Sequence, residues 1–197
     1  MNVRMSPLAV YCGAARGGDP AYAAAAGELG RAMAARGVGL VYGGGKVGLM
    51  GEVADAVLAG GGSVVGIITH ELVRREIAHD GVTDLRIVDT MHERKKAMAD
   101  LARGFVALPG GVGTLDELFE VMAWSQLAIH DHPIGLLNTA GFFDGLLAFL
   151  DHVAGQGFLR TEPREMLVVA SDPEGLLDAM GRYTPPRRRS VGQSPGM

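Results

Sequence analysis

The segment GFVALPGGVGTLDELFEVMAWSQLAI, residues 104–129, contains a strand, a turn and a helix in the order from which the fold class is predicted. It starts with an apolar run at 104–108, continues through the glycine-rich turn 109–114, and ends in helical spacing of apolar residues at 115–129. A run that is apolar throughout is typical of a strand buried on both faces, as in a parallel sheet. Strand, turn and helix in this order predict a βαβ unit.

The same order recurs along the rest of the chain. It predicts an α/β fold: one domain with a Rossmann-like, doubly wound and mostly parallel sheet and helices on both faces. We expect this domain to cover residues 1–183 and a disordered tail, without apolar periodicity, to cover 184–197. The predicted strands are 8–12, 39–42, 63–67, 85–88, 104–108, 134–137 and 166–169, and the predicted helices are 20–36, 49–59, 91–102, 115–129, 142–155 and 173–180.

The composition fits a globular chain and excludes several classes of protein. Of 197 residues, 48% are hydrophobic and 30 are glycine without a three-residue period, which excludes collagen, coiled coil and full disorder. A net charge of -4 gives no bulk attraction to nucleic acid or anionic membranes, so we expect neither partner. The single cysteine, Cys12, and the lack of a signal-like or membrane-spanning apolar segment predict a cytoplasmic protein.

Three glycine-rich turns each follow a predicted strand and precede a predicted helix: 12–18, 43–48 and 109–114. In an open parallel sheet such turns meet at the carboxyl ends of the strands, where ligands bind. Each could be a bland tight turn, but together they favour an anion site made of backbone N–H groups and a helix N-terminus. The turn 109–114 is neither a Walker A loop nor a dinucleotide fingerprint.

Glu117 allows two interpretations. Thr114 and Glu117 have the spacing of a capping box, which would occupy both side chains at the helix start. Alternatively, Glu117 faces the anion site with Asp116 beside it and Glu120 one turn later, a position suited to the oxocarbenium-like transition state of glycosidic hydrolysis.

The basic run MHERKK, residues 91–96, also allows two interpretations. Thr90 and Glu93 form a possible capping box, and the cations behind them could lie on a solvated helix face. They could equally bind phosphate, because they begin a helix at the same sheet edge.

Other motifs carry little chemistry. His130-Asp131-His132 is a weak metal signal and no G-x-S-x-G elbow is present, so we expect neither a metal nor a cofactor. Four apolar residues at helical spacing predict core or dimer contacts: Leu118, Met122, Trp124 and Leu127.

Four motifs resemble the LONELY GUY (LOG) family: YGGGKVGLMG at 42–51, MHERK at 91–95, LPGGVGTLDELFE at 108–120 and WSQLAIHDHPIGLLN at 124–138. The resemblance runs from about Leu8 to Leu177. It implies hydrolysis of the N-glycosidic bond of cytokinin riboside 5'-monophosphates or AMP, with release of the base and ribose 5-phosphate and without a cofactor. It also implies a homodimer whose site is completed across the subunit interface.

The resemblance assigns roles to individual residues. Arg94 and Glu117 match the family's catalytic pair, with Glu120 and Met91 as possible support. The remaining matches are substrate-binding positions: Gly43, Gly44, Gly45, Glu76, Lys95, Gly110, Gly111, Val112, Gly113 and Thr114.

Some positions depart from the family pattern and leave other functions open. Ala14 and Ala15 stand where the family often has two serines, Ala123 replaces a frequent threonine, and Asp116 replaces a frequent glutamate. A nucleotide carrier or sensor of the same fold is the alternative. Amino-acid decarboxylation would need a Schiff-base lysine with partners for the cofactor ring, and the sequence offers no such context.

Overall fold

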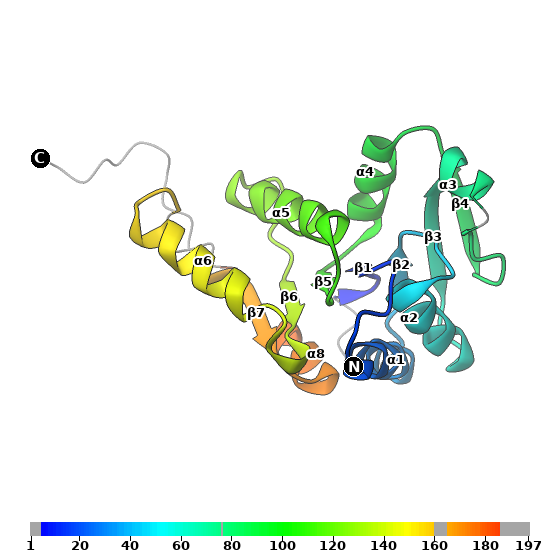
Figure 1. Ribbon diagram of the computed structural model, residues 1–197, viewed down its shortest axis with the longest axis horizontal. Helices are drawn as coiled ribbons and strands as arrows, with labels where there is room; N and C mark the ends of the chain where they lie inside the picture. The colour runs from blue at the N-terminus through cyan, green and yellow to red at the C-terminus, as the bar shows by residue number, and fades with distance from the viewer. Residues whose placement is uncertain (1–4, 76, 160–164, 186–197) are drawn as a thin grey trace, which may run out of the picture.

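A computed structural model describes residues 5–75, 77–159 and 165–185. It contains one seven-stranded sheet in the order β4-β3-β2-β1-β5-β6-β7, in which every pair of neighbours is parallel (Figure 1). This confirms the predicted single α/β domain. The strands are β1 (Leu8–Tyr11), β2 (Leu40–Tyr42), β3 (Val64–Thr69), β4 (Asp84–Val88), β5 (Phe105–Ala107), β6 (Ile134–Leu137) and β7 (Leu167–Ala170).

Helices cover both faces of the sheet, as predicted (Figure 1). One core joins the sheet to α1, α2 and α8 through residues such as Leu29, Val53 and Leu176. The other joins it to α4, α5 and α6 through residues such as Met98 and Leu118. The helices are α1 (Pro20–Ala35), α2 (Gly48–Ala59), α3 (His70–Arg74), α4 (Met91–Leu101), α5 (Val112–Gln126), the 3-10 turn η2 (Thr139–Gly141), α6 (Asp144–Gly155) and α8 (Pro173–Gly181).

Burial explains the uniformly apolar strands. Strands β1, β2, β5 and β6 lie inside the sheet, and every one of their residues is buried. The edge strand β4 has no fully buried residue and includes Asp84 and Arg86. Charged side chains on an edge are typical because they discourage pairing with other chains.

The order of the strands creates a switch point between β1 and β5. The chain adds β2, β3 and β4 on one side of β1, and then returns to place β5, β6 and β7 on the other side. Ligands in such sheets bind outside the carboxyl ends of the strands at this reversal. The turns after β1 and β5 are two of the three glycine-rich turns.

The most consequential boundary error concerns α5, which was predicted at 115–129. It runs from Val112 to Gln126, because Gly111 is the last extended residue and the helix begins inside the glycine-rich turn. Helices α3 and η2 were not predicted, since five and three residues are too few to show periodicity.

Among the described residues, no helix is long and apolar enough to cross a membrane. Most of the predicted tail, residues 186–197, lies outside the described residues.

Candidate active site

The three glycine-rich turns lie against one another at the carboxyl edge of the sheet. Gly13 N–H donates to the carbonyl oxygen of Pro109 at 3.0 Å, and its own carbonyl accepts from Leu49 N–H at 3.0 Å. Gly48 has φ +61, and a Cβ there would collide with the backbone of Ala14. The predicted convergence of the turns is therefore confirmed.

The N-terminus of α5 carries no side-chain cap. Its N-cap residue is Gly111, whose missing side chain leaves the first-turn N–H groups without a capping oxygen. Thr114 is a buried residue of the first turn rather than a cap, so the capping box proposed for Thr114 and Glu117 is wrong. Helices α2 and α6 also begin without a side-chain cap, whereas α1, α4 and α8 begin with caps from Asp19, Thr90 and Asp172.

The glycines before α5 have different surroundings. A Cβ at Gly110 would collide with Oγ1 of Thr114, so this glycine permits close packing of the turn on the helix. A Cβ at Gly111 or Gly113 would meet nothing within 4 Å, and Val112 is 84% exposed. The uncapped end of α5 thus lies open.

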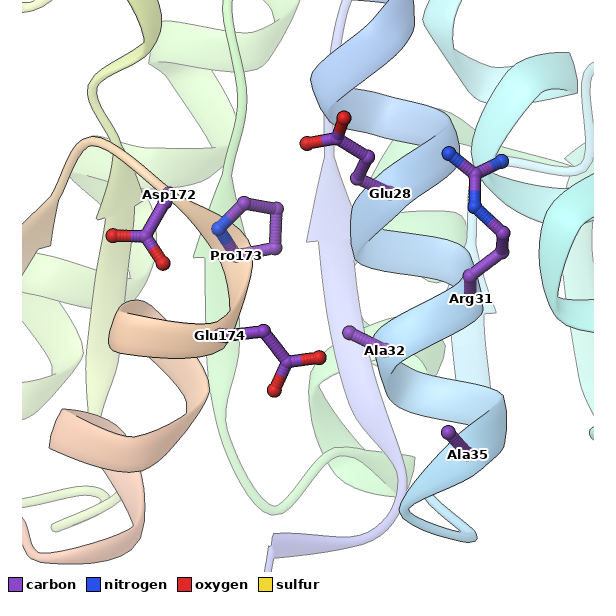
Figure 2. A pocket seen from close by; sticks show the side chains of 7 residues that line it. All are labelled: Glu28, Arg31, Ala32, Ala35, Asp172, Pro173 and Glu174. Carbon is purple, nitrogen blue, oxygen red and sulfur yellow. The ribbon is translucent and has the colours of Figure 1, made fainter.

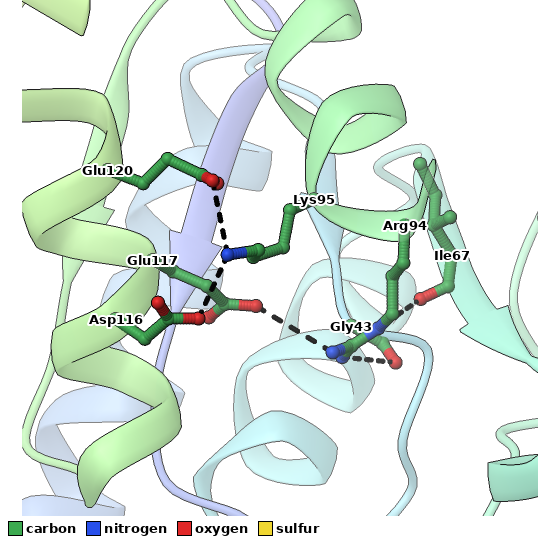
Figure 3. Close-up of polar contacts among 7 residues, drawn as sticks. All are labelled: Gly43, Ile67, Arg94, Lys95, Asp116, Glu117 and Glu120. Atoms are coloured by element: carbon green, nitrogen blue, oxygen red, sulfur yellow. Dashed lines mark hydrogen bonds and ion pairs between the residues drawn. The ribbon is translucent and has the colours of Figure 1, made fainter. Parts of the chain in front are cut away.

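Arg94 is buried at the start of α4, where backbone carbonyls hold it. Its Nε donates to Ile67 O at 2.9 Å and its Nη2 to Gly43 O at 3.0 Å (Figure 3). A Cβ at Gly43 would collide with Nη2, which explains the glycine at that position. The predicted capping box of Thr90 and Glu93 is confirmed, and it starts the helix so that Arg94 points inward. A solvated face is therefore wrong for Arg94.

Glu117 faces Arg94 from α5. Its Oε1 lies 3.7 Å from Arg94 Nη1, and only 13% of its side chain is exposed (Figure 3). Burial raises the pKa of Glu117 to about 7, although Arg94 and Lys95 pull it down, and Asp116 and Glu120 push it up. A carboxyl with a pKa near neutrality changes its charge in the range where enzymes work, so it suits acid-base or electrostatic catalysis.

Lys95 lies beside this pair, also largely buried. Its Nζ contacts Asp116 Oδ2 at 3.0 Å and Glu120 Oε1 at 3.1 Å, which places Glu120 in an ion pair (Figure 3). The next lysine, Lys96, is exposed and pairs with Asp100 on its own helix, as expected of a solvated face.

The turn at Gly43–Gly45 is held down by a segment that sequence reasoning missed. His79 N–H donates to Gly44 O at 2.9 Å, and Ala78 forms a bridge with Gly45. The His79 ring places Nε2 2.9 Å from Asp55 Oδ1 on α2. These partners are 24 residues apart and carry no local motif, so no sequence signal indicates the contact.

The remaining predicted site residues are less informative. Glu76 lies outside the described residues. Met91 is the first residue of α4 and is 48% exposed. The described residues contain no group of three or more His, Cys, Asp or Glu that could hold a metal ion. The His130 and His132 rings stack on each other, and Nε2 of His130 contacts Val121 O at 2.9 Å.

A separate cavity of about 490 Å³ lies between α1 and α8 (Figure 2). Exposed charged side chains such as Glu28, Arg31 and Glu174 surround it, with Ala32 and Pro173 at its wall. It shares no residue with the site built around Arg94.

Comparison with known proteins identifies the family to which this chain is similar. A family model described as "Possible lysine decarboxylase" matches residues 50–180. The probable cytokinin riboside 5'-monophosphate phosphoribohydrolase LOGL2 of Oryza sativa subsp. japonica is 45% identical, over 96% of this chain and 78% of the relative. The cytokinin riboside 5'-monophosphate phosphoribohydrolase LOG3 of Arabidopsis thaliana is 44% identical, over 92% of this chain and 85% of the relative.

Solved structures show the same fold at lower identity. The molybdenum cofactor binding protein of Rippkaea orientalis has a TM-score of 0.67 at 21% identity and covers 88% of this chain and 94% of its own. The molybdenum cofactor carrier protein of Chlamydomonas reinhardtii has a TM-score of 0.65 at 22% identity, over 88% of this chain and 95% of its own. The similarity to the plant enzymes is much closer and spans nearly the whole chain, and on that ground this chain belongs to the LOG family of cytokinin riboside 5'-monophosphate phosphoribohydrolases.

Proposed function

We propose that this protein hydrolyses the N-glycosidic bond of cytokinin riboside 5'-monophosphates, of AMP, or of both, and releases the free base and ribose 5-phosphate. The observation that carries the proposal is the buried pair of Arg94 and Glu117. It lies at the switch point of the sheet, next to the uncapped N-terminus of α5. Family membership supports the same reaction.

The 5'-phosphate is placed by this proposal at the start of α5. The N–H groups of Val112, Gly113 and Thr114 belong to the first turn, where the positive end of the helix dipole attracts anions. The open space at Gly111 and Gly113 leaves room for phosphate oxygens to approach the backbone.

The reaction breaks the bond between C1' of the ribose and the base. The water oxygen forms the new bond to C1', and a proton passes to the leaving base. Positive charge develops on the ribose in the transition state, so an ionised Glu117 stabilises it or accepts a proton from the water. Arg94 has Nε and Nη2 bound to carbonyls, which leaves Nη1 on the Glu117 side to orient that carboxylate or the substrate.

The lysines of this chain are poorly suited to form the Schiff base that amino-acid decarboxylation requires. A Schiff-base lysine needs a lowered pKa so that its amine is neutral and nucleophilic. Burial alone would lower the pKa of Lys95, but hydrogen bonds to Asp116 and Glu120 raise it above the usual value. Lys46 and Lys96 are exposed.

We also propose that the protein is a cytoplasmic homodimer. An apolar stripe along α5 and its C-cap residue supports the dimer. It consists of four exposed residues that recur at intervals of about two turns and then one turn: Val112, Phe119, Ala123 and the C-cap Leu127. The single cysteine supports a reducing compartment, and the acidic net charge gives no reason for nucleic-acid binding.

The test is to incubate the purified protein separately with AMP and with isopentenyladenosine 5'-monophosphate. Free base and ribose 5-phosphate are followed by chromatography, with Glu117→Gln as the control. Equal amounts of both products, absent in the control, are expected from at least one substrate. Saturable nucleotide binding without any product would instead favour the carrier or sensor alternative.

A further inference from the structure

Lys95 connects two helices at the candidate site. It lies on α4, and both of its carboxylate partners, Asp116 and Glu120, lie on α5 (Figure 3). Its side chain is only 12% exposed, whereas that of its neighbour Lys96 is 70% exposed. A buried ammonium must satisfy its hydrogen bonds, and two of the three N–H groups of Lys95 are directed to these carboxylates.

The two carboxylates bound by Lys95 flank Glu117 on the same helix. Without the lysine, two unpaired negative charges would stand beside Glu117 in a partly buried site. Arg94 would then be the remaining cation near Glu117 in the described structure. Lys95 therefore affects Glu117 in two ways: it holds α5 against α4 and it balances the charge around the carboxyl group.

We propose that Lys95 is a positioning residue, whose ammonium clamps Asp116 and Glu120 and thereby holds Glu117 opposite Arg94, rather than a contact for the nucleotide. The proposal rests on the proposed role of Glu117 in hydrolysis. It differs from the substrate-binding role that the resemblance implies for Lys95.

The charged groups around Glu117 make the direction of the effect clear. Arg94 and Lys95 face it from α4, and Asp116 and Glu120 lie beside it on α5. Tyr11 and Cys12 lie close to it at the end of β1, and burial raises the pKa of both, so they are neutral at neutral pH. Removal of Lys95 thus makes ionisation of Glu117 harder.

The experiment compares Lys95→Met with Lys96→Met, two adjacent lysines of which only one contacts α5. For Lys95→Met we expect the pH at which kcat is half-maximal to rise by about one unit, with kcat at pH 7 several-fold lower and KM changed less than about twofold. Lys96→Met should keep the wild-type profile. Adding Glu120→Gln to Lys95→Met removes one unpaired charge and should bring the profile back towards wild type.

A large rise in KM for Lys95→Met with an unchanged pH profile would overturn the proposal, because it would show that Lys95 binds the substrate. If Lys95→Met does not fold, the single variant Glu120→Gln tests the proposal. It should lower the pH at which kcat is half-maximal, and an unchanged pH profile of kcat would contradict the proposal. Failure of the proposed hydrolytic function can be distinguished from failure of the Lys95 proposal, because the wild-type protein itself would then release no base.

Discussion

Glu117 is placed where burial and charge work against each other. Burial favours the neutral carboxyl, while Arg94 and Lys95 favour the carboxylate, and burial prevails because the pKa is raised to about 7. If the ionised form is the active one, kcat should rise with pH and reach half its maximum near pH 7. Measurement at saturating substrate separates this from ionisation of the free nucleotide's phosphate, whose second pKa is about 6. A kcat that falls between pH 6 and 8 would instead indicate that the protonated carboxyl acts.

The same carboxyl should reduce stability at neutral and alkaline pH. The folded state binds the proton of Glu117 more tightly than the unfolded chain, whose carboxyl titrates near 4.5. Stability from this group is therefore complete below about pH 4.5, decreases as pH rises to about 7, and stays low above that. A difference of about 2.5 in pKa corresponds to roughly 3 kcal/mol.

The Glu117→Gln variant has no carboxyl group to ionise at this position, so it should not show this decrease in stability with rising pH. We expect its free energy of unfolding, relative to wild type, to be up to about 3 kcal/mol more favourable at pH 8 than at pH 4. Thermal unfolding followed by circular dichroism at both pH values measures the difference. An equal offset at the two pH values would show that Glu117 titrates normally.

Among single elements, alanine substitutions in two of the glycine-rich turns should have different effects on the enzyme. In Gly43→Ala the new Cβ collides with Nη2 of Arg94, so the guanidinium must move and kcat should fall by about 100-fold or more. In Gly111→Ala the Cβ enters open space at an extended residue, so stability should be nearly unchanged. A phosphate seated there would meet this Cβ, and KM should rise about tenfold.

Unfolding curves and steady-state kinetics of both glycine variants check this prediction. Gly145→Ala, on α6 and without a positive φ, is a control for general effects of adding a methyl group, because the new Cβ would meet nothing within 4 Å. If Gly111→Ala has wild-type KM, the phosphate does not approach that turn.

The elements show where sequence reasoning works and where it does not. Buried strands such as β6, predicted at 134–137 and found at Ile134–Leu137, are set by local apolar runs. The start of α5 was misplaced because T-x-x-E resembles a capping box, whereas here a glycine with no side chain ends the turn. The choice between these two starts depends on how the turn packs on Gly13, which is a contact between distant segments.

In the candidate site, too, some features could be predicted from the sequence and others depend on contacts between distant segments. The glycine turns could be found from the sequence and from the rule that ligands bind at carboxyl ends of parallel strands, whereas the pairing of Arg94 with Glu117 was implied only by the resemblance to the LOG family. The spacing could not show that Ile67 and Gly43 carbonyls hold Arg94, or that His79 reaches Asp55. Such contacts join residues tens of positions apart, so they depend on the finished fold.

At the scale of the whole molecule, α5 connects catalysis with the proposed dimer. One side of this helix carries Glu117 towards Arg94, whereas Phe119 and Leu127 of the apolar stripe are exposed. If the stripe is the interface, a dimer supports the helix that carries the carboxylate. A charge placed on the stripe should therefore reduce both association and activity.

Leu127→Glu tests this coupling, since Leu127 is 71% exposed and its replacement should leave the folded monomer intact. Light scattering should give a dimer for wild type and a monomer for the variant, whose kcat/KM should be at least about tenfold lower. Ile87→Glu is the matched control, because Ile87 is also an exposed apolar residue but lies on the edge strand β4. It should remain a dimer with wild-type activity.

A monomeric wild type would refute the dimer, and a dimeric Leu127→Glu would place the interface elsewhere. A monomeric variant with full activity would show that a single subunit holds a complete site.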